Sequence, residues 1–204
     1  MNAPLAKEVT MSEILKDIQR LVGTTPDGVY GPKTETAIAS VLGVQSILPQ
    51  SLIRTGDTIY GLAGDEELLV NVPVPDEYPL TYEGKRVSTI RVHYLVADKM
   101  TNILRETAEV YGPDIAKLAP GLCVYSGSYN NRSVSNGTKK SMHAWGLAID
   151  MDAEANAYVF NHTKARLARA EYSKFWDIVA KHGGFSLGKH SDCDWMHFQF
   201  ASFN

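Results

Sequence analysis

The chain has 204 residues, 44% of them hydrophobic, which is enough for one medium-sized domain or for a small domain joined to a larger one. Its 20 basic and 23 acidic residues give a net charge of −3 without a long basic run, so we do not expect nucleic acid as a partner. Two distant cysteines, Cys123 and Cys193, exclude a disulfide framework and lack the CxxC spacing of a structural zinc site.

The N-terminal stretch MNAPLAKEVTMSEILKD lacks a basic segment followed by an apolar one, which is the pattern of a secretory signal. No stretch of the sequence has the apolar length needed to cross a bilayer. We therefore expect a soluble chain that is made in the cytoplasm and does not insert into a membrane.

Residues 10–43 have the pattern of two short helices around a turn. Residues 10–13 (TMSE) fit a capping box, and the apolar residues of 14–22 keep helical spacing up to a glycine. TPDGVYGPKT then predicts a turn, with Pro32 at the first position of a second helix whose apolar stripe covers residues 37–42.

This segment resembles the peptidoglycan-binding module, whose signature is a helix, then D-G-x-x-G-x-x-T, then a second helix. The residues that match the signature are Asp27, Gly28, Gly31 and Thr34. The resemblance implies a wall-binding module over residues 1–44, although the usual third helix has no evident counterpart. The alternative is a helical hairpin that packs on the rest of the protein.

Residues 45–77 carry several prolines and glycines and predict a linker with at most one short strand or hairpin. From residue 78 to 204 the pattern is that of one α+β domain, with a small antiparallel sheet and flanking helices. The elements expected are strands within 86–96, 121–129 and 194–203 and helices over 98–112 and 165–184.

The stretch SMHAWGLAIDMD, residues 141–152, combines a strand pattern with polar groups. Leu147, Ile149 and Met151 alternate with Ala148, Asp150 and Asp152, which predicts one face toward a core and a carboxylate face toward a cleft. His143 precedes the strand and is able to fold back over the face that bears Asp150. The alternative is a surface histidine beside two solvated carboxylates.

A second polar group lies in DCDWMHFQF, residues 192–200. His197 is in the apolar strand, and Asp194, three positions earlier, must lie in the turn before it to share the same cleft. Two histidines and one aspartate suit a catalytic zinc ion, because three protein ligands leave one position open for water. A further carboxylate must then move the proton of that water, and Asp194 is the candidate.

The first motif, S-x-H-x-x-G-x-A-x-D, followed by D-W-x-H-F, resembles the D-alanyl-D-alanine carboxypeptidase and L-alanyl-D-glutamate endopeptidase family of zinc peptidases. That family belongs to a larger group with lysostaphin-type enzymes and hedgehog. The matching residues are Ser141, His143, Gly146, Ala148 and Asp150, then Asp194, Trp195 and His197. The resemblance covers about residues 78–204 and implies that His143, Asp150 and His197 bind one zinc ion and that Asp194 is the general base.

The family usually has an arginine after an S-G-Y segment, placed to stabilise an oxyanion. This chain reads SGSYNNRSVSNG, so the candidate arginine, Arg132, comes late; a loop arginine in water is the alternative. We also predict substrate contacts for Ser126, Ser141 and Trp145. Asp152 is either a partner of the metal ligands or a solvated strand residue.

Together, a wall-binding module, a wall peptidase and no export signal predict a bacteriophage endolysin whose partner is peptidoglycan. Such a monomer would be held in the host cytoplasm until a holin releases it to the cell wall or periplasm. The expected bond is L-alanyl-D-glutamate in the stem peptide. Alternatives are D-alanyl-D-alanine carboxypeptidase activity and a non-catalytic wall-binding protein, although Asp194 argues against the latter, since a binding protein needs no general base.

Overall fold

The computed structural model describes residues 10–30, 34, 37, 38, 41, 47–135 and 137–203. The chain divides into two compact units, one of Met1–Ser46 with Asp57–Ile59 and one of Ile47–Gly56 with Tyr60–Asn204. Each unit is described by itself. The functional boundaries expected at residues 44 and 77 stay a prediction.

The first helix described in the smaller unit is α1, Met11–Leu21. The expected capping box is confirmed: the Thr10 hydroxyl accepts from the Glu13 amide, and the Glu13 carboxylate accepts from the Thr10 amide at 2.9 Å. In the expected second helix, positions 34, 37, 38 and 41 are helical. Its predicted start at Pro32 and its end, at residues 42 and 43, lie outside the described residues.

Gln19 is the buried polar centre of this unit, with 1% of its surface exposed. Its side-chain amide donates to the Asp27 carboxylate at 2.7 Å, the Val29 carbonyl at 3.0 Å and the Thr34 hydroxyl at 2.9 Å. Its side-chain oxygen accepts from the Gly28 amide at 2.8 Å. One glutamine of α1 therefore fixes the turn that follows the helix.

The larger unit contains a four-stranded antiparallel sheet in the order β5-β6-β8-β7. The strands are β5 (Tyr125–Gly127), β6 (Ala148–Met151), β7 (Phe185–Ser186) and β8 (His197–Gln199). The α+β class with a small antiparallel sheet and flanking helices is thus confirmed. The strands are shorter than expected, because residues 120–123 form a 3₁₀ turn before β5 and the final strand ends at Gln199.

Two hairpin-like pairs accompany this sheet. Strand β1 (Leu69–Pro73) pairs antiparallel with β4 (Thr89–His93), and β2 (Thr81–Tyr82) pairs with β3 (Lys85–Arg86). β1 falls in the stretch expected to be a linker, yet it pairs along its whole length with a strand of the α+β domain.

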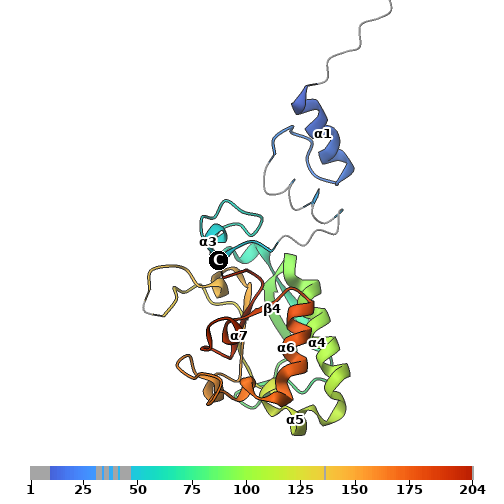
Figure 1. Ribbon diagram of the computed structural model, residues 1–204. Helices are drawn as coiled ribbons and strands as arrows, with labels where there is room; N and C mark the ends of the chain where they lie inside the picture. Colours follow the sequence, from blue (N-terminus) through green and yellow to red (C-terminus); the bar gives the residue numbers. More distant parts are fainter. Residues whose placement is uncertain are drawn as a thin grey trace, which may run out of the picture. The chain divides into compact units, whose positions relative to one another are not determined.

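The two main helices, α4 (Ala97–Tyr111) and α6 (Ser173–Lys181), lie side by side (Figure 1). The Glu106 carboxylate of α4 pairs with Lys181 and His182, at the C-terminal end of α6, at 2.8 Å each, and these ion pairs join the two helices. The helix expected over 165–184 is wrong in its first half, where two 3₁₀ turns, Arg166–Ala168 and Ala170–Tyr172, precede α6.

Shorter helices complete the unit. They are α3 (Gln50–Ile53), α5 (Ile115–Leu118) and α7 (Leu187–Ser191), with further 3₁₀ turns at Glu66–Leu68, Tyr94–Val96, Gly112–Asp114, Pro120–Cys123, Met142–Trp145 and Ala153–Asn156. Within the described part of the chain, none of the helices is both long and apolar enough to cross a bilayer.

Candidate metal centre

His143 is delivered to the site by a tight turn before β6. Ser141 precedes the 3₁₀ turn Met142–Trp145, and its hydroxyl accepts from the His143 amide at 3.4 Å. Gly146 then has φ +66°, and a Cβ there would lie 2.9 Å from the His93 amide nitrogen. Glycine is therefore required at this position for the chain to turn from His143 into the strand.

Asp150 and His197 meet because they are directly opposite each other in the β6–β8 pair. The Asp150 Oδ1 lies 2.9 Å from His197 Nδ1, and its Oδ2 lies 3.1 Å from His143 Nε2. One ligand atom of each residue lies within 4.8 Å of the others, which is close enough for one metal ion. The predicted ligand set is thus brought together by the turn and the sheet.

Each histidine commits its other ring nitrogen to an oxygen atom. His143 Nδ1 contacts the Ser128 carbonyl, and His197 Nε2 contacts the Gln199 side-chain oxygen at 3.1 Å, while the Gln199 amide donates to the Ala201 carbonyl at 2.8 Å. Since a carbonyl oxygen only accepts, these nitrogens carry the protons. In the neutral rings, His143 Nε2 and His197 Nδ1 are then lone-pair donors, which is the usual arrangement of metal-binding histidines.

The donor set fits a zinc ion. Two imidazole lone pairs and a carboxylate oxygen converge, and zinc binds both kinds of donor well. In the described part of the chain, His143 Nε2 is buried without a hydrogen-bond partner, since its contact with Asp150 lacks hydrogen-bond geometry. Bound metal would give this atom its partner.

Electrostatics in the metal-free protein agree with this geometry. Burial alone would raise the pKa of Asp150, but the close contacts of its carboxylate with the His143 and His197 rings hold it well below its usual range. Burial alone would lower the pKa of His197, but its hydrogen bond and charge interaction with Asp150 raise it overall. The carboxylate therefore stays ionised beside the two rings.

Asp194 lies in the turn before β8, as expected, with φ +54°. Its carbonyl accepts from the His197 amide at 3.0 Å, and its buried Oδ1 has no hydrogen-bond partner among the described residues. Burial raises the pKa of Asp194, with the nearby His197 acting in the opposite direction. A carboxylate with a raised pKa and a free oxygen is suited to accept a proton from water.

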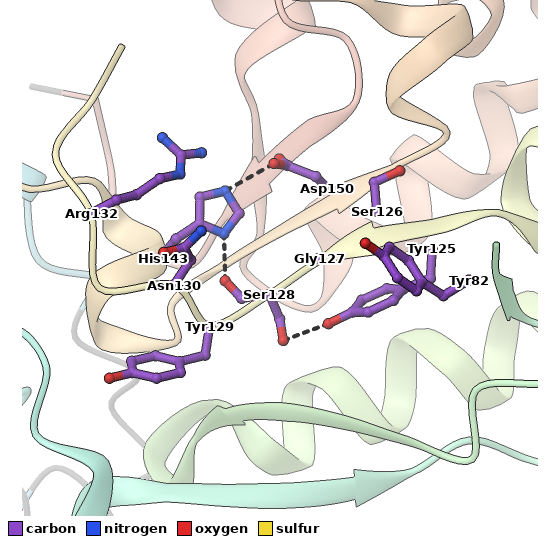
Figure 2. A pocket seen from close by; sticks show the side chains of 10 residues that line it. All are labelled: Tyr82, Tyr125, Ser126, Gly127, Ser128, Tyr129, Asn130, Arg132, His143 and Asp150. Atoms are coloured by element: carbon purple, nitrogen blue, oxygen red, sulfur yellow. Dashed lines mark hydrogen bonds and ion pairs between the residues drawn. The ribbon is translucent and has the colours of Figure 1, made fainter.

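A pocket of about 360 Å³ lies on the Asp150 and His143 side of the cluster (Figure 2). Figure 2 shows Asn130 and Arg132 at one end, beside His143, and Tyr82 and Tyr125 at the other. The residues that line the pocket are Tyr82, Tyr125, Ser126, Gly127, Ser128, Tyr129, Asn130, Arg132, His143 and Asp150.

Arg132 is exposed, and its guanidinium donates to the adjacent Ser133 carbonyl at 3.3 Å. Its charge also lowers the pKa of Asp194, as a lesser cause. Arg132 thus lines the pocket that holds two of the ligands, and its role on an oxyanion stays a prediction.

The three residues expected to contact substrate differ in their surroundings. Ser126 lines the pocket, and its hydroxyl accepts from the Ala153 amide at 2.9 Å. Ser141 and Trp145 are buried, and the Trp145 indole donates to the Gly61 carbonyl at 2.9 Å. Neither is among the residues that line the pocket, and their contact with substrate stays a prediction.

Asp152 is not a solvated strand residue, so that interpretation is wrong. It follows β6 with φ +50° and is 4% exposed. Its carboxylate pairs with Arg166 at 3.1 Å and accepts from the Asn156 side chain at 3.2 Å. Strand β6 ends at Met151, although the alternation of apolar and polar residues in the sequence continues to Asp152. The side chain of Asp152 therefore points into the protein interior and not along the polar face of the strand.

The sequence analysis did not predict the residues that orient the metal-ligand histidines or several of those that line the pocket beside them. Ser128 and Gln199 orient the two histidines, and Tyr82, Tyr125 and Tyr129 line the pocket. Only position 199 carried a signal, because it shares a strand face with His197.

Residues 135–200 match the family model described as D-alanyl-D-alanine carboxypeptidase. The match spans 66 of the 204 residues and includes the three ligand candidates and Asp194, whereas Arg132 lies before it. This similarity, together with the His–Asp–His cluster, suggests a zinc peptidase that acts on cell-wall peptides. A comparison with curated proteins found no match, and a comparison with solved structures likewise found none.

Proposed function

We propose that this protein is a zinc-dependent peptidase that hydrolyses a peptide bond in the stem peptide of peptidoglycan. The observation that carries the proposal is the convergence of His143 Nε2, Asp150 and His197 Nδ1 beside the unpaired carboxylate oxygen of Asp194. The similarity of residues 135–200 to D-alanyl-D-alanine carboxypeptidases supports the substrate class.

The residues that would hold zinc are His143, Asp150 and His197. When bound, zinc acts as a Lewis acid and makes a water molecule more acidic at neutral pH. Asp194 accepts a proton from the attacking water and returns it to the departing amine. Arg132 supplies positive charge to the carbonyl oxygen as negative charge develops there.

The bond that we propose is L-alanyl-D-glutamate, cut as an endopeptidase. Support for this choice is the resemblance of the sequence to a family that includes such endopeptidases, together with the resemblance of residues 27–34 to the signature of a wall-binding module. The second candidate is removal of the terminal D-alanine, which is favoured by the description of the matching family. In that case Arg132 would bind the free carboxylate of the substrate.

The biological role that we propose is that of a monomeric endolysin, stored in a host cytoplasm and admitted to the cell wall by a holin. Residues 1–44 would concentrate the enzyme on its polymeric substrate. Expression in bacteria tests this role: cells should remain intact until the inner membrane is permeabilised and should then lyse. A protein with the Asp194→Asn substitution is the control, and it should not lyse the cells in either condition.

Mass spectrometry of digested peptidoglycan tests the activity. New amino termini at D-glutamate, lost with a chelator and restored by zinc, are the expected result. Release of D-alanine alone would establish the carboxypeptidase instead. No product from a folded, zinc-loaded protein would refute both activities and favour a non-catalytic wall-binding protein.

A further inference from the structure

The loop of residues 157–163 lies against the turn that carries Asp194. In this loop the Tyr158 carbonyl accepts from the Asp194 amide at 3.1 Å. His162 donates its backbone amide to Asp192 Oδ1 at 2.7 Å, and its Nδ1 lies 2.7 Å from Asp192 Oδ2. Three contacts therefore join this loop to the turn of the proposed general base.

The loop has a fixed base. The buried Asn156 side chain donates to the Asp152 carbonyl at 2.7 Å and accepts from the Leu167 amide at 2.7 Å. Asn156 thus closes the loop directly after β6, the strand that carries Asp150. The loop that carries Tyr158 and His162 is therefore anchored next to the strand of Asp150.

The turn itself has a backbone that needs outside support. Asp192 and Asp194 have φ +50° and +54°, a left-handed conformation that costs free energy for a residue with a side chain. Asp192 ends helix α7, and its Oδ1 also accepts from the Trp195 indole at 3.2 Å. A Cβ at Gly188 would lie 2.4 Å from the Trp195 ring, so α7 already contacts this indole closely.

These contacts act locally. The side chains of His162 and Asp192 are 63% and 47% exposed, and an ion pair so exposed adds little to the free energy of unfolding. In the described structure the His162–Asp192 pair does not contact the metal-ligand residues. It does, however, fix the turn that contains Asp194, which is only two residues after Asp192. Its effect should appear in the position of the Asp194 carboxylate and not in the stability of the fold.

We propose that His162 is a positioning residue, which acts through Asp192 and the 157–163 loop to hold Asp194 in place for proton transfer. This inference rests on the proposed function, because it assigns His162 a role in the reaction in which Asp194 is the base. It concerns the rate of the chemical step and not the binding of metal or substrate.

The test compares two substitutions at the same position in the full chain. His162→Phe keeps a ring but removes the donor, whereas His162→Asn removes the ring but keeps an amide donor where Nδ1 stands. We expect His162→Phe to lower kcat about 10-fold with KM, zinc content and Tm unchanged, because a small misplacement of a catalytic group costs this much. His162→Asn should restore kcat. His182→Ala, which breaks the histidine–carboxylate pair with Glu106 of α4, should leave kcat unchanged.

Amide hydrogen exchange of Asp194 provides a readout that does not depend on activity. Its protection should fall about 10-fold in His162→Phe and return in His162→Asn. Normal kcat in His162→Phe, or a loss of kcat that His162→Asn does not restore, would overturn the proposal. If the wild-type protein cuts no peptidoglycan bond, the proposed function fails, the catalytic part of the proposal fails with it, and amide exchange alone decides whether His162 holds the turn.

Discussion

Gln199 should control zinc affinity without binding the metal. Its side-chain oxygen lies 3.1 Å from His197 Nε2, on the side of the ring away from Asp150. The substitution Gln199→Met keeps a side chain of similar length and removes both the acceptor and the donor. His197 then loses the hydrogen bond that keeps its Nδ1 lone pair directed at the metal position.

The expected magnitudes follow from these contacts. Loss of a hydrogen bond that orients a metal-binding histidine lowers metal affinity about 10–100-fold, or about 1.4–2.7 kcal/mol. The substitution also leaves the buried His197 N–H and the Ala201 carbonyl without Gln199, and each lost partner costs about 1–3 kcal/mol. The free energy of unfolding of the metal-free protein should therefore fall by about 2–6 kcal/mol.

Competition with a chromophoric chelator measures the zinc affinity, and urea unfolding of the metal-free protein measures the stability. Gln199→Glu is the matched variant, because its carboxylate still accepts from His197 Nε2 while the donor to Ala201 is lost. Zinc affinity should therefore fall in Gln199→Met and persist in Gln199→Glu. A zinc affinity of Gln199→Met within twofold of the wild type would refute the orientation argument.

Three further outcomes are expected. Asp194→Asn should keep its zinc, measured by elemental analysis, while kcat on peptidoglycan falls at least about 100-fold because the proton acceptor is gone; undiminished turnover would exclude Asp194 as the base. Gly146→Ala should lower the free energy of unfolding by about 2–4 kcal/mol, measured with urea, because it adds both left-handed strain and a contact with the His93 amide. In the metal-free protein, the lowered pKa of Asp150 gives stability that is lost as pH falls below the usual carboxyl range, and the raised pKa of His197 gives stability that is lost as pH rises past its folded value. The loss of stability in Asp150→Asn, measured by thermal unfolding against pH, should thus be largest between about pH 4 and 6.5, and a loss that does not vary with pH would contradict the pairing.

Local sequence patterns were sufficient to predict α1 and α4, because their capping residues and the spacing of their buried residues are visible within the segment itself. In α4 the buried residues recur at helical spacing, and the capping box at Thr10 forms between residues three positions apart. The pairing of β1 with β4 was not predictable in this way, because strand partners depend on contacts distant in sequence. The segment before α6 has an apolar pattern, but its two short 3₁₀ turns place Leu167 and Tyr172 in the core without a continuous helix.

The sequence predicted which residues could bind a metal ion, but it did not predict the strand register that brings them together. The donor types at His143, Asp150 and His197 indicated a metal centre, whereas their convergence depends on the pairing of Asp150 opposite His197. A shift of one residue in this register would direct His197 to the other face of the sheet. The burial of Asp152 was unpredictable for a related reason, since alternation in the sequence does not reveal where a strand ends.

The N-terminal signature and the peptidase-like motifs differ in how many of their polar atoms already have hydrogen-bond partners within the chain. In the segment with the D-G-x-x-G-x-x-T signature, Asp27 and Thr34 accept from Gln19, and the Gly28 amide donates to it. A Cβ at Gly28 would lie 2.4 Å from the Ser12 hydroxyl, so its glycine also serves the packing of the turn on α1. These residues therefore build the local fold of the turn.

In the peptidase-like motifs, the histidines are oriented by Ser128 and Gln199, yet His143 Nε2 and Asp194 Oδ1 have no hydrogen-bond partner in the described structure. A buried polar atom without a partner costs about 1–3 kcal/mol, so each such atom needs an explanation. In the described structure His93 Nε2 and Thr107 Oγ1 also lack a partner, but only His143 Nε2 and Asp194 Oδ1 lie beside a set of metal-ligand donors, where a bound ion and its water would complete them. Both atoms border the same His–Asp–His cluster. This contrast, together with the motifs, supports the proposal that the chemistry takes place at the β6–β8 pair.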